Sequence, residues 1–211
     1  MSREVVLSRV RSALSGSKTE ALPATPAYRR TGILTGEQRL HMFEERLGEY
    51  GARVFQSSEP DLRERLATVL IEGQKLKMVH PPGLPESWLD RRISWTADAP
   101  GVDGLSFTQI ESFDGVLTAA TVAVAESGSI VLHHGPTEGR RALTLLPDYH
   151  LCVLFSHQVV ETLPECFERL KGSATRPTTF ISGPSATGDI EMTRIKGVHG
   201  PRFLDVILLS P

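Results

Sequence analysis

Hydrophobic and polar positions follow a helical period and a strand period in turn along much of the chain. Apolar residues recur at helical spacing over residues 40–50 and 62–70. Short apolar runs suited to strands follow these two stretches, at 52–55 and 76–79. Helices that alternate with short strands predict an α/β fold, a mixed but mainly parallel sheet layered by helices.

The centre and the C-terminal part of the chain add further strands. Residues 115–132 are β-branched on both sides of the Glu126-Ser127-Gly128 turn, which predicts a hairpin and so an antiparallel element. The apolar runs at 149–155 and 203–209 are suited to central strands of a sheet. Residues 178–181 form a short β-favouring run that predicts a buried strand.

One more helix is predicted between these strands. Its apolar positions share one helical face: Val160, Leu163, Phe167 and Leu170. Pro164 is expected to break this helix, and Thr162 and Glu165 have the spacing of a capping box for the second piece.

The first 31 residues differ from the rest. Val5, Val6, Val10 and Leu14 indicate a short amphipathic helix, and residues 15–31 are rich in Ser, Thr, Ala and Pro. We therefore expect a helical arm and linker over residues 1–31 and a single domain over residues 32–211. The arm either packs on a partner or frays into solvent.

Composition narrows the class of protein. With 211 residues, 40% of them hydrophobic and 23% charged, the chain has the make-up of one globular domain plus an appendage. A net charge of −2 and a pI near 6.4 disfavour nucleic acid as the main partner. The N-terminus lacks the apolar core of a secretory signal, and no run approaches the length of a membrane span. We expect a cytoplasmic protein.

Two cysteines, Cys152 and Cys166, are too few for a disulfide framework or for an iron–sulfur cluster, which takes four thiolates. No CxxC, HExxH or GxGxxG pattern is present. His133, His134 and His199 are a poor metal set, because neighbouring strand residues point to opposite faces. We expect no metal and no cofactor in this chain, so any cluster would belong to a partner.

The loop that follows the strand at 178–181 is the richest candidate site. Its residue types can present hydroxyls and backbone amides to a phosphate or carboxylate. These residues are Ser182, Gly183, Ser185, Thr187 and Asp189. The alternative is an ordinary capped turn, since such residues gather at most strand-to-helix connections.

Five other residues could carry binding or chemistry. Arg140 and Arg141 can hold an anion through their guanidinium groups, or can instead pair with acidic neighbours on the surface. Arg202 is a further candidate for anion binding. His199 is placed between glycines as a general acid, base or hydrogen-bond donor, and Glu126 as a nucleophile or base, although a turn carboxylate commonly just faces water.

Three segments together resemble a known family. They are AVAESGSIVL (123–132), GRRALTLLPDYHLCVL (139–154) and ISGPSATGDIEMTRIKGVHGPR (181–202), followed by a closing hydrophobic strand. In this order they are similar to the LUD (lactate-utilization domain) family, and in particular to its lactate utilization protein C branch. The resemblance covers roughly the C-terminal half of the chain.

The resemblance implies a fold similar to that of ribose-phosphate isomerase, glucosamine-phosphate deaminase and the CoA-transferases. It also implies membership in a three-component system that oxidises L-lactate to pyruvate, with electrons leaving through companion iron–sulfur proteins. The larger companion of the family carries cysteine-rich segments that this chain lacks, so the resemblance makes this chain the cluster-free component. A small anion would then lie near Arg140 or Arg141 and the amides after Gly183, with His199 near its C2 hydroxyl.

Three functions remain open on the sequence. The first is a subunit of a lactate-oxidising complex that is not an enzyme alone. The second is a stand-alone enzyme of the sugar-phosphate isomerase or CoA-transferase kind, which would use Glu126 and the Ser182 loop. The third is a binding or regulatory module without chemistry.

Overall fold

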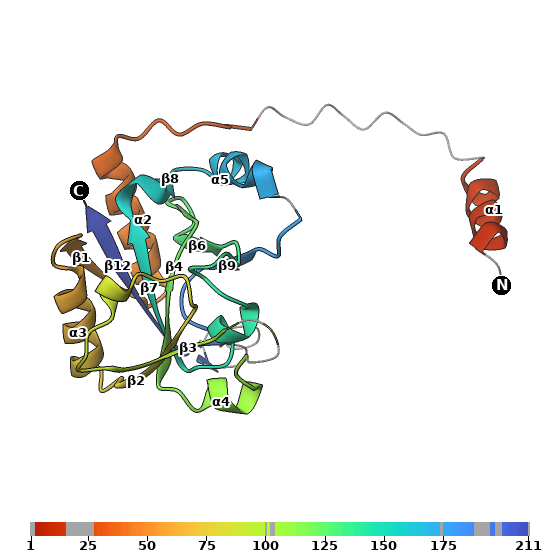
Figure 1. Ribbon diagram of the computed structural model, residues 1–211. Helices are drawn as coiled ribbons and strands as arrows, with labels where there is room; N and C mark the ends of the chain where they lie inside the picture. Colours follow the sequence, from red (N-terminus) through yellow and green to blue (C-terminus); the bar gives the residue numbers. More distant parts are fainter. Residues whose placement is uncertain are drawn as a thin grey trace.

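The computed structural model describes residues 3–15, 28–99, 101, 104–173, 175–187, 195–196 and 200–210. Figure 1 shows a sheet with helices packed around it, and one helix, α1, apart from the rest of the chain. The α-helices are α1 (Arg3–Leu14), α2 (Gly36–Glu49), α3 (Leu62–Glu72), α4 (Phe107–Glu111) and α5 (Leu163–Leu170). Short 3-10 helices are η1 (Glu86–Trp88), η2 (Arg141–Thr144), η3 (Ser156–Gln158) and η4 (Lys171–Ser173).

The main sheet has six strands, and every pairing in it is parallel. Across the sheet they are β1 (Arg53–Ser58), β12 (Phe203–Ser210), β7 (Tyr149–Phe155), β4 (Gly115–Ala119), β2 (Lys77–His80) and β3 (Ser94–Ala97). The α/β fold expected from the sequence is confirmed. From β2 the chain steps outward to β3, then returns across β2 to β4 and continues in the opposite direction to β7.

A second, smaller sheet packs beside the first. Its four strands, in spatial order, are β8 (Val159–Val160), β5 (Val122–Val124), β6 (Ser129–Leu132) and β9 (Thr179–Ile181). β5 and β6 form an antiparallel hairpin, β9 extends it antiparallel to β6, and β8 pairs parallel to β5. A two-stranded ribbon joins β10 (Ala186–Thr187) to β11 (Ile195–Lys196).

The hairpin predicted over residues 115–132 is therefore only partly right. Its first strand, β4, pairs with β2 and β7 and so belongs to the parallel sheet. The hairpin proper is β5 and β6, closed by the predicted Glu126-Ser127-Gly128 turn, in which Gly128 donates to the carbonyl of Ala125. A run of β-branched residues predicts strands, but it does not show that the first of them pairs in a different sheet from the others.

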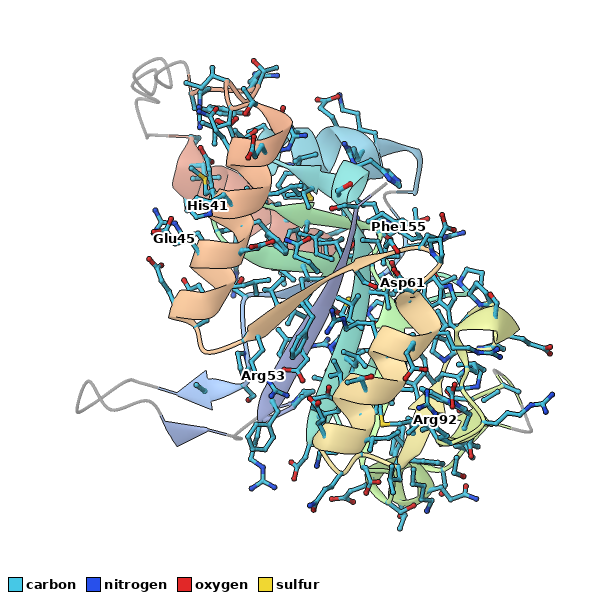
Figure 2. All side chains as sticks on the ribbon, turned by 90° about the vertical axis from the view of Figure 1, so that its left-hand side faces the viewer. His41, Glu45, Arg53, Asp61, Arg92 and Phe155 are labelled. Atoms are coloured by element: carbon cyan, nitrogen blue, oxygen red, sulfur yellow. The ribbon has the colours of Figure 1, made fainter. Side chains whose placement is uncertain are left out.

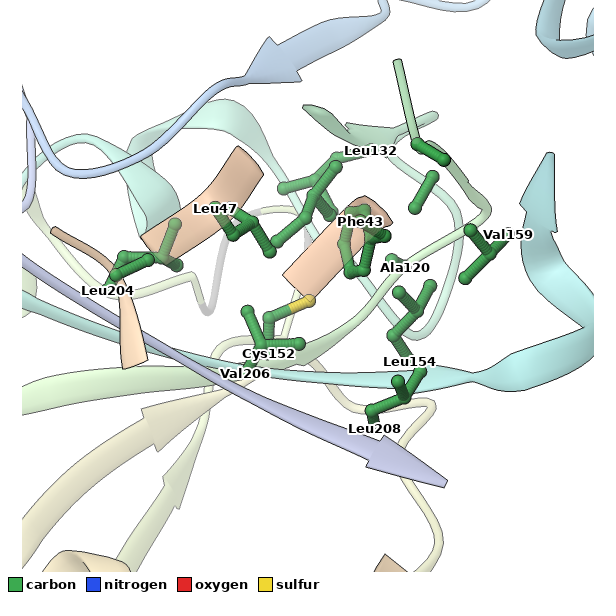
Figure 3. Close-up of a cluster of buried hydrophobic side chains, with 14 residues drawn as sticks. Phe43, Leu47, Ala120, Leu132, Cys152, Leu154, Val159, Leu204, Val206 and Leu208 are labelled. Atoms are coloured by element: carbon green, nitrogen blue, oxygen red, sulfur yellow. The ribbon is translucent and has the colours of Figure 1, made fainter. Parts of the chain in front are cut away.

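Both faces of the main sheet are buried, which explains the continuous apolar runs of its central strands. On one face Cys152 and Leu154 of β7 pack against Phe43 and Leu47 of α2 and against Leu132 of the small sheet (Figure 3). On the other face Leu151 and Val153 belong to a cluster built around α3, with partly buried side chains from the segment between β2 and β3.

Helix α5 covers the outer face of the small sheet. Cys166 and Leu170 of α5 cluster with Val122, Val124 and Val131. The helix begins at Leu163 with Thr162 as N-cap, and the predicted capping box with Glu165 is present. Of the predicted apolar face, Leu170 is buried on the helix and Val160 is buried in β8, but Leu163 and Phe167 are 43% and 53% exposed, so the prediction is only partly right. Pro164 lies in the first turn of the helix instead of breaking it, and positions 166 and 170 face the sheet.

Strand β9 was expected to be buried and is half-exposed. Among the described residues it pairs only with β6, and Phe180 is 42% exposed. The Phe180 ring lies 6.1 Å from that of Phe167 on α5. An edge strand has one neighbour, so its apolar residues are covered on one side only.

The predicted N-terminal helix is present as α1, and all its described side chains are exposed. What it packs against stays a prediction, as does the domain boundary at residue 31. None of the helices in the described part of the chain is long and apolar enough to cross a membrane.

Candidate functional site

Two cavities adjoin Arg141. The first has a volume of about 260 Å³ and opens between β9 with its following loop, η2, and the starts of β7 and β12. It is lined by Arg141, Thr144, Leu145, His150, Thr179, Phe180, Ile181, Ser182, Gly183, Pro184, Ser185, Gly200, Pro201 and Leu204. The structure thus brings four of the predicted site residues together: Arg141, Ser182, Gly183 and Ser185.

The loop that walls this first cavity has one backbone position that requires glycine. Gly183 has φ +94°, and a Cβ there would lie 2.4 Å from the Cβ of Tyr50 at the end of α2. Ser185 N–H donates to the carbonyl of Pro201 at 2.8 Å, which joins the two sides of the wall. The hydroxyl of Ser182 is 2.6 Å from that of Ser129 on β6.

A buried histidine that the sequence analysis missed lies against the same cavity. His150 on β7 is 1% exposed, and its Nε2 lies 2.8 Å from the hydroxyl of Thr118 on β4. Burial lowers the pKa of His150 to about 4, so its ring is neutral at pH 7. A histidine inside an apolar run is typical of a core position, and only the polar Thr118 on the neighbouring strand hints at a partner.

The two thiols of the chain are shielded from solvent. Cys152 lies in the core, with its Sγ 3.9 Å from the Thr118 hydroxyl, and Cys166 lies on the face of α5 that packs on the small sheet. Burial raises the pKa of Cys152 to about 12 and that of Cys166 to about 11. Both are therefore protonated and poor nucleophiles at neutral pH.

The second cavity, of about 580 Å³, lies on the other side of Arg141. It is lined by Pro82, Asp98, His134, Gly135, Pro136, Gly139, Arg140, Arg141, Arg176 and Pro177. Pro82 and Asp98 follow the carboxyl ends of β2 and β3. This is the edge of a parallel sheet at which α/β folds place ligands.

His134 helps to form the wall between the cavities. It has φ +49°, an uncommon conformation for a residue with a side chain. Its Nδ1–H donates to the carbonyl of Gly139 at 2.8 Å, and its Nε2 lies 2.8 Å from the hydroxyl of Thr179. Thr179 faces the first cavity and His134 the second, so this contact ties the small sheet to the loop before η2.

The two predicted arginines differ in their partners. Arg140 binds the buried carboxylate of Asp98 through two bonds of 2.7 and 2.9 Å and also donates to the carbonyl of Leu105. The bond to Asp98 raises the pKa of Arg140. Arg141 is exposed, lines both cavities and has no ion pair within the described part of the chain. Arg140 therefore pairs with an acidic neighbour, which was the alternative to anion binding, whereas the guanidinium of Arg141 is available to a ligand.

Comparison with known proteins places this geometry in a family. The family model of the LUD domain matches residues 40–209. The chain belongs to the LUD domain family. The matched span of the LUD domain contains both cavities and both sheets.

Individual relatives agree with this assignment. The chain is 39% identical over 207 residues to Lactate utilization protein C of Deinococcus radiodurans, covering 97% of this chain and 94% of that protein. It is 35% identical over 101 residues to Lactate utilization protein C of Shouchella clausii, covering 46% of this chain and 44% of that protein. A crystal structure of a DUF162 family protein from Deinococcus radiodurans superposes with a TM-score of 0.73 at 35% identity, covering 84% of this chain and 100% of that one.

Glu126 of the LUD domain lies outside both cavities. It pairs with Arg29 of the linker, which also donates to the buried carboxylate of Glu161 at 2.6 Å. Glu161 further accepts the amides of Ile33 and Leu34, both at 2.7 Å. We name this cluster, made of residues 29–34 with Glu126, Glu161 and Glu165, the linker clasp. A catalytic role for Glu126 stays a prediction.

Gly32 is the tightest point of the linker clasp. Its amide donates to Glu165 at 3.0 Å, and a Cβ on it would lie 2.4 to 2.7 Å from three atoms of Glu161. The clasp joins segments about 130 residues apart in sequence, so no local pattern signals it.

Among the remaining predicted site residues whose side chains the structure describes, Arg202 lines neither cavity. Arg202 pairs with Asp148, and both side chains are about half exposed. Thr187 ends β10. Asp189 and His199 lie outside the described residues, so their proposed roles stay predictions.

A third cavity, of about 480 Å³, opens at the amino ends of β1, β7 and β12. There Asp205, 2% exposed, accepts from Arg53 at 2.8 and 2.5 Å and from the hydroxyl of Tyr149 at 2.7 Å. Burial and the Asp205 carboxylate raise the pKa of Tyr149. Figure 2 shows Arg53 and Phe155 at opposite ends of the parallel strands. Arg53, Tyr149 and Asp205 bond to one another, which makes a structural role the simplest account of these three groups.

Proposed function

We propose that this LUD protein is the cluster-free subunit of a three-protein system that oxidises L-lactate to pyruvate. The observation that carries the proposal is the end-to-end similarity to a protein named Lactate utilization protein C, which covers 97% of this chain. Its partners would be iron–sulfur proteins that accept the electrons.

The first cavity supports binding of a small anion by this subunit. Arg141 offers a guanidinium that no described carboxylate engages, and Ser182 and Ser185 bring hydroxyl groups to the same space. A volume of about 260 Å³ suits a molecule of the size of lactate or pyruvate with a few waters. We place the ligand carboxylate on Arg141 and its polar oxygen toward the Ser182–Ser185 loop.

The described residues favour binding over electron transfer as the contribution of this chain. Oxidation of lactate removes two electrons and two protons, and the electrons need an acceptor. Both thiols are buried and protonated at neutral pH, and the neutral His150 is held by Thr118. The acceptor is therefore assigned to the partner proteins.

The first test is affinity purification of the protein from its own cells grown on L-lactate, with iron content and lactate-dependent dye reduction measured on the eluate. We expect iron-containing partners and an activity that is lost when the chain is stripped of them. A partner-free, iron-free chain that turns over sugar phosphates or CoA esters would instead establish a stand-alone enzyme and contradict the proposal.

The anion site has its own test in calorimetric titration of the purified chain with L-lactate and pyruvate. Arg141→Ala is expected to weaken binding about tenfold or more, because a charge-assisted bond is lost. Arg91→Ala, an exposed arginine before β3, is the matched control and should bind like the wild type. Equal affinity of the two variants would remove Arg141 from the site.

A further inference from the structure

The second cavity opens beyond the carboxyl ends of β2 and β3, next to a topological switch point of the main sheet. β2 and β4 are neighbours, yet the chain leaves β2 toward β3 on one side and leaves β4 toward β7 on the other. The carboxyl ends of two such strands leave a crevice in which open α/β sheets bind ligands. Pro82, just after β2, lines the cavity, and β4 is tied to its rim because Ala119 N–H donates to the carbonyl of Thr137 at 3.0 Å.

The rim of this cavity is held in place before any ligand arrives. Glu138, 2% exposed, accepts the amide of His133 at 2.6 Å, the amide of Gly135 and the hydroxyl of Thr121. Gly83 N–H donates to the carbonyl of Pro136 at 3.0 Å. A fixed rim lowers the conformational cost of binding. The uncommon backbone of His134 in the same loop fits a segment kept for function and not for stability.

The charges in the second cavity call for an anion with more than one negative charge. Asp98, the carboxylate among the described lining residues, is engaged by Arg140. Arg141 and Arg176 come from separate segments, and neither has an ion pair within the described ranges. Two guanidinium groups that face one space suit a phosphate or diphosphate, which both can bind through paired bonds.

The apolar lining residues of the second cavity indicate which chemical group lies beside the phosphates. Pro82, Pro136 and Pro177 are rigid and apolar and offer no side-chain hydrogen bonds. The amides of Gly135 and Gly139 are already bonded within the loop. The three prolines therefore suit a flat heteroaromatic ring better than a bare sugar ring, whose surface is mostly hydroxyl groups. A volume of about 580 Å³ lies in the range of small-molecule sites and exceeds what lactate can fill.

We infer that the second cavity is a nucleotide site, with the phosphates on Arg141 and Arg176 and the base against the three prolines. This site shares Arg141 with the lactate site, and Arg176 and the three prolines line the second cavity alone. The chain has no GxGxxG fingerprint, because the phosphate donors here are side chains and not the amides of a glycine-rich turn.

The inference is tested by calorimetric titration with ADP, adenosine and pyrophosphate. ADP should bind, and each half-molecule should bind at least about tenfold more weakly. Arg176→Ala should weaken ADP binding about tenfold or more while L-lactate binding stays as in the wild type. Arg91→Ala is again the matched control. If the wild type binds ADP but not L-lactate, the result contradicts the proposed function and leaves the nucleotide site standing.

A second variant tests the site even if another residue can bind the phosphates in place of Arg176. Gly135→Leu adds a side chain toward the space beside Arg176, whose Nη1 would be 3.8 Å from the new Cβ, so it should exclude ADP by filling the cavity. Absence of ADP binding to the wild type at millimolar concentration, or ADP binding unchanged in both variants, would overturn the inference. Pyrophosphate that binds as tightly as ADP would overturn the role of the proline wall.

Discussion

The linker clasp and the surroundings of Arg141 use the same kinds of groups in opposite ways. In the clasp, one carboxylate, Glu161, is 1% exposed and takes three donors from the linker. Around Arg141, guanidinium groups face two cavities and the described acids nearby are already engaged. The charged groups of the clasp bond to one another, whereas the guanidinium of Arg141 beside the cavities has no ion pair among the described residues.

The difference separates residues that hold the fold from residues that can hold a ligand. A buried carboxylate that already accepts several internal donors adds stability and is shielded from a substrate. A cation beside a cavity adds little stability and keeps its donors for an anion. Arg140 and Arg141 are neighbours in sequence and fall on different sides of this division.

The largest effect is expected from breaking the clasp. Glu161→Ala leaves the amides of Ile33 and Leu34 without their acceptor and removes one of the two carboxylates that bind Arg29. We expect the free energy of unfolding to fall by about 3 kcal/mol in urea denaturation. Glu168→Ala, which removes an exposed partner of Lys171, is the control and should change stability by less than about 0.5 kcal/mol. Equal losses in the two variants would show that the clasp is dispensable.

The pH dependence of stability should show whether water reaches the buried His150 beside the first cavity. Because burial lowers the pKa of His150 from 6.5 to about 4, the unfolded chain takes up a proton that the folded chain does not. Stability is therefore complete above pH 6.5 and falls as the pH drops from 6.5 to about 4, by roughly 2 to 3 kcal/mol. His150→Asn should lose this part of the pH dependence. A wild type and variant with parallel stability curves would mean that water reaches the ring.

The neighbouring arginines give a direct test of the comparison. Arg140→Ala leaves the buried Asp98 unpaired and should lower the free energy of unfolding by about 2 kcal/mol. Arg141→Ala should change stability by less than about 0.5 kcal/mol, while it weakens anion binding. Denaturation and titration of both variants would separate the roles. If Arg141→Ala proved the more destabilising of the two, the division drawn here would fail.

The smallest effect is expected at Arg202. Its pair with Asp148 is half exposed on both sides and lies outside the lining of the cavities. Arg202→Ala should leave the denaturation midpoint and the affinity for L-lactate within experimental error. A clear loss of lactate affinity would bring back Arg202 as an anion-binding residue, as its sequence position suggested.

The sequence predicts best those elements whose signal is local. The strands β7 and β12 are long apolar runs because both of their faces are buried, and the capping box of Thr162 spans only four residues. The loop residues Ser182, Gly183 and Ser185 were found for the same reason, since their types favour turns.

Features that depend on contacts between distant residues could not be predicted from the sequence. Glu161 and the linker lie more than 120 residues apart, and nothing near either one marks the other. The difference between Arg140 and Arg141 depends on Asp98, about 40 residues earlier. The exposure of β9 depends on which strand lies at the sheet edge, and periodicity does not encode that order.

The two shielded cysteines make this protein easy to label at one chosen point. Cys152 and Cys166 are fully buried, and their thiolate forms are suppressed at neutral pH. A single cysteine introduced at an exposed position such as Phe180, beside the first cavity, would be the one that reacts with a maleimide dye or spin label. Ligand-dependent motion of the Ser182–Ser185 loop can thus be followed spectroscopically in a chain that keeps both of its native thiols.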